Sequence, residues 1–493
     1  MICRVSKYVP VWLFTLLAIV VPALSQSSDF SVIVLPDTQH YSEKFPEIFN
    51  KQTEWIVENL ESRNIKFVIG VGDIVEHPEN IAEWQNADAA IRMLDGKVPY
   101  VMAIGNHDYK DQKPSSRSAE NFNAYFGPSR YSGYSWYGAS NYPTGSNENF
   151  YATVTVGTTK FLILALEFMP RDAALTWASD VLDSHPDTEV IITTHSYMWT
   201  DNTRADQCDQ NDLNRDNDGQ EMWDNFVKQH ANTIMVVNGH FIRDTGGSRR
   251  RDLGVNWNLV NQMFSNYQDF KNGGNGYLRI LKFRPSLNVI EVSTYSPWLD
   301  ASLTDDDNQF TVPYHRPATS GTTGTIKGRT RGRRLNGFYD CKSISDANVS
   351  DGTDSATTDS TGRFDFTLTH GTYTLTASKS AWVTTSKGIG VYAGYTTDAP
   401  MFLKPVVGKV TGKVTDSSGA AISGANLNFS GGKLTPTKAL NFLTDSSGNY
   451  TTASLSVGSY EVTISKTGYV TETRTKTVTA DTTGTLNVTL QKQ

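Results

Sequence analysis

Short apolar runs alternate with polar turns and amphipathic segments over the first half of the chain. Runs this apolar are typical of strands that are buried on both faces, in a sheet that helices cover. The runs that predict strands are Phe30–Leu35, Phe67–Val71, Val98–Ile104, Phe161–Leu166, Val190–Thr194 and Ile234–Val237. Helical spacing predicts two of the helices between them, one with Ile48, Trp55, Ile56 and Leu60 and one with Met222, Trp223, Phe226 and Val227.

The pattern changes in the second half of the chain. Tyr277–Phe283 and Val289–Thr294 still predict strands, whereas residues 301–325 are rich in Asp, Thr, Gly and Pro and have the composition of a linker. Beyond them helical periodicity disappears. Strict alternation, as in Tyr373–Ala377 and Tyr460–Ile464, is the period-two pattern of half-buried strands.

The C-terminal part of the chain also repeats itself at an offset of 86 to 87 residues. Asp359–Gly362, Gly371–Tyr373, Lys379 and Trp382 return as Asp445–Gly448, Gly458–Tyr460, Lys466 and Tyr469. An internal repeat of alternating strands predicts two tandem β-sandwich domains. The expected organisation is a processing segment at 1–25, an α/β domain at 26–305, a linker at 306–322, and β-sandwiches at 323–405 and 406–493.

The first 25 residues have the pattern of a cleaved secretory signal. Arg4 and Lys7 precede the apolar run Val11–Val21, and small residues follow at 23–25. The run is too short to span a bilayer comfortably. We therefore expect a protein that is secreted or held in the periplasm or cell envelope, with no membrane span after cleavage.

Composition narrows the classes of partner. The formal net charge is −7, and because the first 25 residues contain two basic and no acidic residues, the remainder carries −9. An acidic chain without basic clusters argues against dedicated nucleic-acid binding, and the short run Arg249–Arg251 is expected in a solvated loop. Of the three cysteines, Cys3 lies in the signal, while Cys208 and Cys341 either pair or remain thiols.

Polar residues able to bind metal follow five of the apolar runs. They are Asp37, Asp73, Asn106, His195 and His240. The carboxyl ends of strands in such sheets form the usual ligand crevice. A mixture of oxygen and nitrogen ligands suits Mn, Fe or Zn better than Ca or Mg. A carboxylate such as Asp73, placed between two such ions, would allow them to clamp a phosphate and activate a water.

The motifs around these residues resemble those of the calcineurin-like metallophosphoesterases. They are Pro36-Asp37-Thr38-Gln39, Gly72-Asp73-Ile74-Val75-Glu76, Gly105-Asn106-His107-Asp108, Thr194-His195-Ser196 and Asn238-Gly239-His240. Their order and spacing match over about residues 30 to 300. The resemblance implies an α/β fold in which two mixed β-sheets form a sandwich flanked by helices, here followed by two all-β sandwich domains.

The resemblance also implies roles for individual residues. Asp73, Asn106, His195 and His240 would hold one divalent ion, and Asp37 and Asp73, with Gln39, the other. His107 would contact the phosphate and protonate the leaving group, Asp108 would orient His107, and a metal-bridging hydroxide would be the nucleophile. Asn106, His107 and Arg243 are the expected substrate-binding residues.

Three positions depart from the family pattern. Gln39 stands where a histidine ligand belongs, Ile242 stands where the last histidine belongs, and Glu76 replaces an aspartate. The ion held by Asp37 and Asp73 therefore keeps only these two as clear ligands. We expect this site to be weak and the site of Asp73, Asn106, His195 and His240 to be tight. The residues that could complete the weak site are His40, His77 and Asp244.

These observations predict an exported metal-dependent hydrolase of phosphate mono- or diesters, acting on a phosphorylated small molecule or a nucleotide-like substrate. The C-terminal repeats resemble carboxypeptidase regulatory-like domains, which are transthyretin-like sandwiches, in segments such as Ile326–Gly328 and Val410–Gly412. We expect these C-terminal domains to contact a cell surface or a glycan. The alternative is a cell-surface binding or adhesive protein whose phosphoesterase domain is weak or inactive.

Overall fold

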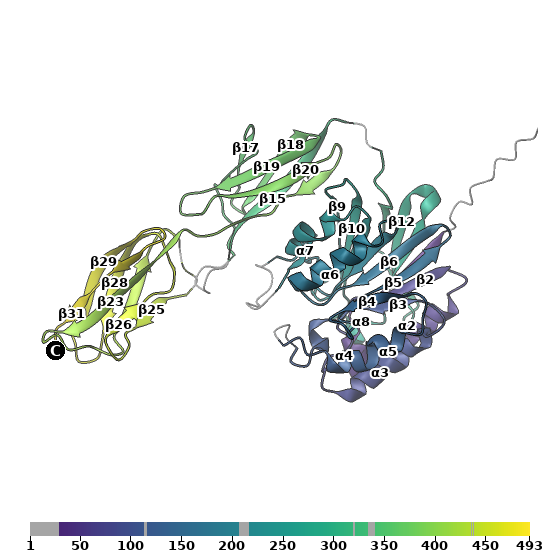
Figure 1. Cartoon of the computed structure of the whole chain (residues 1–493), viewed down its shortest axis with the longest axis horizontal. Helices are drawn as coiled ribbons and strands as arrows, with labels where there is room; N and C mark the ends of the chain where they lie inside the picture. The colour runs from purple at the N-terminus through teal and green to yellow at the C-terminus, as the bar shows by residue number, and fades with distance from the viewer. Residues whose placement is uncertain are drawn as a thin grey trace, which may run out of the picture.

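The computed structural model describes residues 29–112, 116–206, 216–318, 321–333, 341–434, 436 and 438–493. The expected signal at 1–25 and Cys208 lie outside these ranges. Cys341 lies inside them and is disulfide-bonded. In the described ranges, no helix has both the length and the apolar character needed to cross a bilayer. Figure 1 shows one large α/β body followed by two smaller all-β bodies along the chain.

The first sheet of the α/β body is mixed and has seven strands, in the order β13-β12-β11-β1-β2-β3, with β14 also pairing with β12. β1, β2 and β3 are parallel neighbours, and β11 runs antiparallel to β1. The bounds are β1 Phe30–Leu35, β2 Ile65–Gly70, β3 Tyr100–Met102, β11 Leu278–Arg284, β12 Val289–Ser296, β13 Ala301–Leu303 and β14 Phe310–Pro313.

The second sheet also has seven strands, in the order β4-β5-β6-β7-β8-β10-β9. Here β6, β7 and β8 are parallel neighbours. The bounds are β4 Tyr137–Tyr142, β5 Asn149–Val156, β6 Thr159–Ala165, β7 Glu189–Thr193, β8 Thr233–Asn238, β9 Gly247–Leu253 and β10 Leu259–Ser265.

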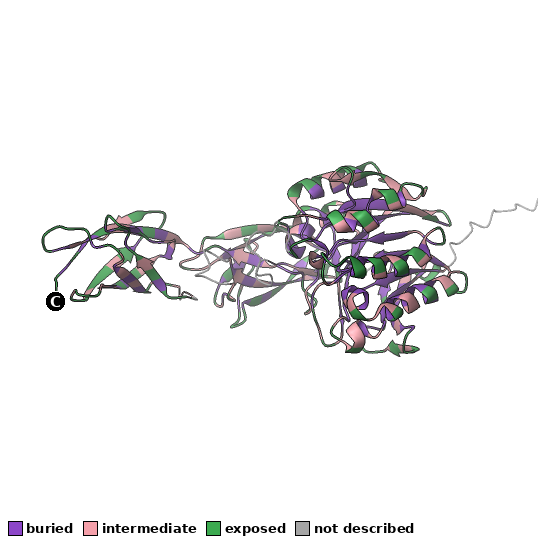
Figure 2. Cartoon of the chain, turned by 90° about the horizontal axis from the view of Figure 1, so that it is seen from below, coloured by how far each residue is buried: buried purple, intermediate pink, exposed green. Residues whose placement is uncertain are grey.

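Helices lie on the outer sides of the two sheets. They are α1 Gln39–Lys44, α2 Pro46–Glu58, α3 Ile81–Ile91, α4 Glu120–Phe126, α5 Pro128–Tyr131, α6 Asp172–Asp183, α7 Gly219–Asn225 and α8 Lys271–Gly274. Short 3-10 helices occupy Arg92–Leu94, Asn106–Asp108, Val227–Gln229 and Pro285–Leu287. Figure 2 shows the buried residues gathered on the strands and the exposed ones on the outer helix faces.

The alternation of side chains along β6 explains how the layers are held together. Phe161 and Ile163 point into the core between the two sheets, where the ring of Phe161 lies 5.5 Å from that of Phe30. Leu162 and Leu164 point the other way, into the core under α6 and α7. Because successive side chains of a strand face opposite sides, an unbroken apolar run serves both cores. The expected two-sheet sandwich flanked by helices is therefore confirmed.

The expected linker at 306–322 is partly a strand. β14 pairs antiparallel with β12, so Ile290 lies opposite Val312 and Val292 opposite Phe310. Val312 is buried and Phe310 packs against the core between the sheets. The surrounding Asp-rich composition concealed this short alternating segment, which extends the first sheet beyond residue 305.

Each C-terminal body is a pair of small sheets. The first pairs a sheet of β18-β15-β21, with β22, against β17-β16-β19-β20, and the second pairs β23, β26, β27, β30 and β31 against β25-β24-β28-β29. The first body spans β15 Thr323–Gly332, β16 Asn348–Ser350, β17 Ser355–Thr357, β18 Arg363–Thr369, β19 Gly371–Ser378, β20 Thr385–Val391, β21 Thr396–Asp398 and β22 Met401–Leu403. The second spans β23 Val407–Asp416, β24 Asn426–Gly431, β25 Leu440–Leu443, β26 Asn449–Thr451, β27 Leu455–Ser456, β28 Gly458–Ser465, β29 Glu472–Val478, β30 Thr483–Thr485 and β31 Val488–Leu490.

The repeat seen in the sequence is also a repeat of structure. Trp382 bridges to Pro405 in the first body, and Tyr469 bridges to Lys492 in the second. All four positions keep the offset of 87 residues. The two bodies are therefore copies of one sandwich.

Candidate metal centre

Five strand ends bring the predicted ligands to one edge of the α/β body. Asp37, Asp73 and Asn106 follow the parallel strands β1, β2 and β3, and His195 and His240 follow the parallel strands β7 and β8. Parallel strands end at the same edge of a sheet. Since the sheets pack face to face, the ends of the first sheet meet those of the second.

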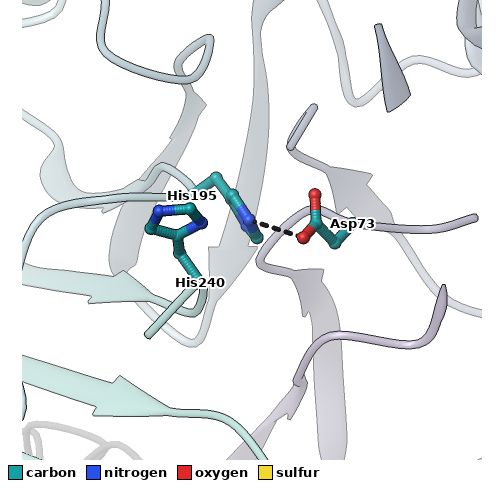
Figure 3. Close-up of side chains that lie close together, drawn as sticks. All are labelled: Asp73, His195 and His240. Carbon is teal, nitrogen blue, oxygen red and sulfur yellow. Dashed lines mark ion pairs between the residues drawn. The ribbon is translucent and has the colours of Figure 1, made fainter. Parts of the chain in front are cut away.

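Asp73, His195 and His240 form the centre of this group. One ligand atom from each lies within 4.8 Å of the others, and no other such group of three or more occurs among the described residues (Figure 3). Nε2 of His195 lies 3.0 Å from Oδ2 of Asp73. Nδ1 of His195 must be the protonated nitrogen because it lies 2.9 Å from the carbonyl oxygen of Val71, which can only accept. Nε2 is thereby directed at the shared space.

Three potential ligand atoms in the described part of the chain are buried without a hydrogen-bond partner. They are Asp37 Oδ1, Gln39 Oε1 and Asn106 Oδ1. Unpaired buried polar atoms are costly and rare in native proteins. Oxygen and imidazole nitrogen that gather in this way satisfy themselves by binding divalent ions, so the residues present fit a metal centre.

Backbone strain is concentrated at two of these residues. Asp73 has a φ of 49° and His240 a φ of 76°, a region that non-glycine residues rarely adopt. Of the glycines that precede ligands, only Gly72 has a positive φ. Gly105 and Gly239 are needed for space instead, because a Cβ would lie 2.1 Å from Asp73 Oδ1 and 1.9 Å from Asp37 Oδ1.

Burial and mutual charge shift the ionisation of the group. Burial raises the pKa of Asp37 to about 8. Burial opposes the charged forms of Asp73 and His195, but their attraction outweighs it, so the pKa of His195 rises to about 9 and that of Asp73 falls well below its usual range. Burial and the charge of His195 lower the pKa of His240 to about 3. Metal binding requires deprotonated ligands, so an ion must displace protons from Asp37 and His195.

His107 lies at the exposed rim of the site. Its side chain is 26% exposed, and its backbone N–H donates to Asp73 Oδ1 at 2.9 Å. Its Nδ1 lies 3.1 Å from the carbonyl oxygen of Glu76 and 3.3 Å from Glu76 Oε2. Nδ1 is thereby occupied, and Nε2 is left to meet a ligand.

Asp108 does not make the contact that the resemblance implies. Its buried carboxylate accepts the backbone N–H groups of Ile74, Val75 and Gly105, at 2.8, 3.2 and 2.8 Å. Burial, followed by the charge of Asp73, raises its pKa to about 7. Asp108 therefore fixes the loops after β2 and β3 to each other, and the contact with the imidazole of His107 comes from Glu76.

The weaker half of the predicted centre is only partly furnished. Nε2 of Gln39 donates to Asp73 Oδ2 at 3.3 Å, which leaves its Oε1 unpaired. His40 lies 3.1 Å from Glu43 and His77 lies 2.9 Å from Glu83, so both are engaged elsewhere. Asp244 and Ile242 are exposed.

Asn266 is a site residue that the sequence reasoning missed. Its Nδ2 donates to Asp37 Oδ2 at 2.9 Å, beside the backbone N–H of His240, which donates to the same oxygen at 3.0 Å. Together they hold one oxygen of Asp37 and leave Oδ1 for an ion. Asn266 directly follows β10, so the strand-end rule that identified the other residues would have found it.

Arg243, expected to bind substrate, is engaged by two other contacts. Its Nη1 donates to the carbonyl oxygen of Gly247 at 2.8 Å, and its Nη2 lies 3.2 Å from Asp307. Its role toward a substrate stays a prediction.

Comparisons with known proteins address the two parts of the chain separately. Residues 30–244 match the family model described as calcineurin-like phosphoesterase, and residues 409–491 match that of the carboxypeptidase regulatory-like domain. YvnB, an uncharacterised protein of Bacillus subtilis (strain 168), is 34% identical over 283 residues, which are 56% of this chain and 21% of that protein. The match thus spans about a fifth of the length of this relative.

Two solved structures are similar at low sequence identity. The purple acid phosphatase PPD1 of yellow lupin (Lupinus luteus) is 15% identical, with 58% of this chain and 54% of that chain covered and a TM-score of 0.38. The Bacillus anthracis TIE protein is 16% identical, with 44% and 43% covered and a TM-score of 0.27. On the family matches, residues 30–244 form a calcineurin-like phosphoesterase domain, and residues 409–491 form a carboxypeptidase regulatory-like domain.

Proposed function

We propose that the protein is an exported, metal-dependent hydrolase of phosphate mono- or diesters. The observation that supports this most directly is the convergence of Asp73, His195 and His240 within 4.8 Å. Three further ligand atoms, from Asp37, Gln39 and Asn106, are buried without a hydrogen-bond partner. The family match of residues 30–244 supports the reaction class. Export rests on the signal pattern of residues 1–25.

The centre has two unequal halves. Asp73, Asn106, His195 and His240 form what we call the histidine half, and Asp37 and Gln39, which share Asp73 with it, form the aspartate half. Nitrogen-rich ligands favour Mn, Fe or Zn. When bound, two such ions supply charge stabilisation for the phosphoryl oxygens and acidify a water.

The residues of the chain orient the substrate and move its proton. His107 presents Nε2 at the rim, because Nδ1 faces Glu76. An imidazole held in this way can donate a hydrogen bond to a phosphate oxygen and a proton to the leaving group. The buried Asp108 keeps the loop that holds Asn106 and His107 in place.

The substrate class that we propose is a phosphorylated small molecule or a nucleotide-like ester. Specificity in such folds resides in loops. The segment before β4 contains Tyr134 and Trp136, whose rings stack at 5.0 Å, and Trp136 also packs against the core between the sheets. The two sandwiches are proposed to contact a cell surface or a glycan.

Metal analysis and paired assays test the proposal. The full chain, loaded in turn with Mn, Fe, Co or Zn, is assayed on p-nitrophenyl phosphate as monoester and bis-p-nitrophenyl phosphate as diester. We expect turnover of at least one ester, its loss in His107→Ala, and no change in His315→Ala, a histidine that is 52% exposed and pairs with Glu189. No hydrolysis with any ion would contradict the proposal and favour the binding-protein alternative.

A further inference from the structure

The first sandwich is attached to the phosphoesterase domain through charged contacts. Arg331 Nη1 lies 2.9 Å from Asp206 Oδ2, and Lys387 Nζ lies 2.8 Å from Asp224 Oδ2. β21 lies beside β9, the edge strand of the second sheet. The two domains therefore meet over a defined surface.

A cavity of about 620 Å³ opens between the two domains. This volume is within the range of pockets that hold small organic ligands. The sandwich contributes four cationic side chains to its lining, Lys327, Arg329, Arg331 and Arg363. None of them is part of the metal centre.

Three of these cations lie close together on one face of a sheet. Arg329 is directly opposite Arg363 across β15 and β18, and Arg331 lies two residues further along the same face of β15. Like charges directly opposite each other destabilise a sheet. Partial burial, followed by the charges of Arg331 and Arg363, lowers the pKa of Arg329. The charges of Asp201 and Asp206 act in the opposite direction but do not outweigh these effects, so a bound anion would relieve the repulsion that remains.

Two of the arginines form no ion pair with an acidic side chain in the described part of the chain. Arg329 donates from Nε to the carbonyl oxygen of Thr361 at 2.9 Å and from Nη2 to Ser343 Oγ at 2.6 Å, so neutral acceptors fix its guanidinium. Among the ion pairs of the described residues, neither Arg329 nor Arg363 has an acidic partner. Both guanidinium groups line the cavity with N–H groups left to donate.

The acidic residues of the lining attract the two arginines without forming an ion pair with them: the charges of Asp201 and Asp206 raise the pKa of Arg329, and the charge of Arg363 lowers that of Asp359. Each is engaged by another group or faces another cation. Asp206 pairs with Arg331, Asp398 with Arg250, Asp359 accepts backbone N–H groups of its own turn, Asp201 accepts from Thr203, and Asp365 lies opposite Lys327.

We propose that this interdomain cavity is a second, non-catalytic ligand site, in which Arg329 and Arg363 bind the phosphate or sulfate group of a small molecule. Guanidinium groups bind tetrahedral oxyanions through paired, charge-assisted hydrogen bonds, which supply geometry as well as attraction. The cavity is larger than a free oxyanion requires, so the ligand has a further organic part, such as a sugar. The site does not depend on the phosphoesterase activity.

Calorimetric titration of the metal-free full chain tests this site. Chelator-treated protein is titrated with inorganic phosphate, sulfate and glucose 6-phosphate at constant ionic strength. We expect binding of glucose 6-phosphate that is about ten-fold weaker or more in Arg329→Gln/Arg363→Gln, since two charge-assisted contacts are lost. His107→Ala should leave it unchanged.

The matched control removes two charges from the second sandwich. Arg474 is 49% exposed and Lys413 is exposed, so Lys413→Gln/Arg474→Gln changes net charge equally without touching the cavity. Its affinity should equal that of the unmodified protein. An equal loss of glucose 6-phosphate affinity in both double variants would overturn the proposal, because binding would then depend only on net charge. A loss of affinity in His107→Ala would also overturn it, because the ligand would then occupy the catalytic centre. Failure of ester hydrolysis alone would leave this result intact.

Discussion

The two halves of the metal centre differ in how firmly the protein holds their ligand atoms. In the histidine half, His195 is fixed by the carbonyl oxygen of Val71, and His240 lies on a strained backbone with a φ of 76°. The rings of the two histidines lie 4.9 Å apart. In the aspartate half, Asp37 is firmly held, whereas the side chain of Gln39 is oriented only by a 3.3 Å hydrogen bond to Asp73.

The difference shows that a metal site is set by its supporting contacts as much as by its ligands. Asp37 is oriented by Asn266 and by the backbone of His240. Among the described residues, the side chain of Gln39 forms one hydrogen bond, to Asp73, which is itself a proposed ligand. The aspartate half should therefore exchange its ion readily, while the histidine half retains one.

Removing a histidine should have the largest effect. We expect His195→Ala to lower kcat/KM by more than about 100-fold, the upper range for loss of an outer-shell partner, because a direct ligand is lost. Metal content should fall to less than one tight ion per chain. His315→Ala, which alters an exposed histidine, should keep both values. Retention of one tight ion in His195→Ala would show that the histidine half is not the tight site.

Replacing Asp37 should affect the aspartate half alone, and it should change how the free energy of unfolding depends on pH. Burial raises the pKa of Asp37 to about 8 in the metal-free protein, above its unfolded value of 3.8. The folded state thus holds a proton that the unfolded state loses. The contribution of Asp37 to the free energy of unfolding is therefore fully present below about pH 4 and is lost as the pH rises through about 8.

Metal-free Asp37→Asn should accordingly gain stability relative to the unmodified protein between pH 5 and pH 8. Urea unfolding of both proteins at the two pH values measures the difference in free energy of unfolding. The same variant, loaded with metal, should lose the weak ion and keep the tight one. A stability difference that is equal at both pH values would mean that Asp37 is ionised in the metal-free fold.

Replacing Gln39 should strengthen or abolish the weak half. Gln39→His supplies a nitrogen ligand next to Asp73, and we expect the weak ion to bind about ten-fold more tightly, an effect of the size seen for changes around metal ligands. Gln39→Leu removes the amide oxygen at similar volume and should prevent the second ion from binding. Calorimetric titration with Mn or Zn distinguishes the two. Equal weak-site affinity in all three proteins would exclude Gln39 as a ligand.

The sequence predicted the fold and the converging residues because both follow from local patterns. β1 begins and ends at the residues the apolar run predicted, and three of the five strand-end residues, Asp73, His195 and His240, bring ligand atoms within 4.8 Å of one another. The contact partners of the site residues could not be predicted in the same way. Whether His107 is met by Asp108 or by Glu76 depends on how two loops close over each other, and periodicity contains no information about loop closure. The strand at Phe310–Pro313 was missed because its four residues lie in an Asp-rich segment.

One arginine outside both halves positions the rings of the histidine half. Arg117 donates from Nη1 to the carbonyl oxygen of Phe168 at 2.6 Å and from Nη2 to that of Met169 at 2.8 Å. Met169 has a φ of 47°, so this turn is strained. The ring of Phe168 lies 5.0 Å from that of His240 and 5.7 Å from that of His195. Arg117 thus supports the surface on which both imidazoles rest.

The smallest predicted effect follows from this contact. Lysine keeps the charge of Arg117 but cannot form the fork that spans two carbonyl oxygens. We expect Arg117→Lys to lower kcat about ten-fold with little change in KM, and to weaken the tight ion while the weak ion is unaffected. A purely structural role would lower the midpoint of thermal unfolding without separating the two ions. A loss of metal affinity at the tight site alone therefore indicates that Arg117 positions the histidines. An equal loss of affinity at both sites would show that Arg117 only stabilises the fold.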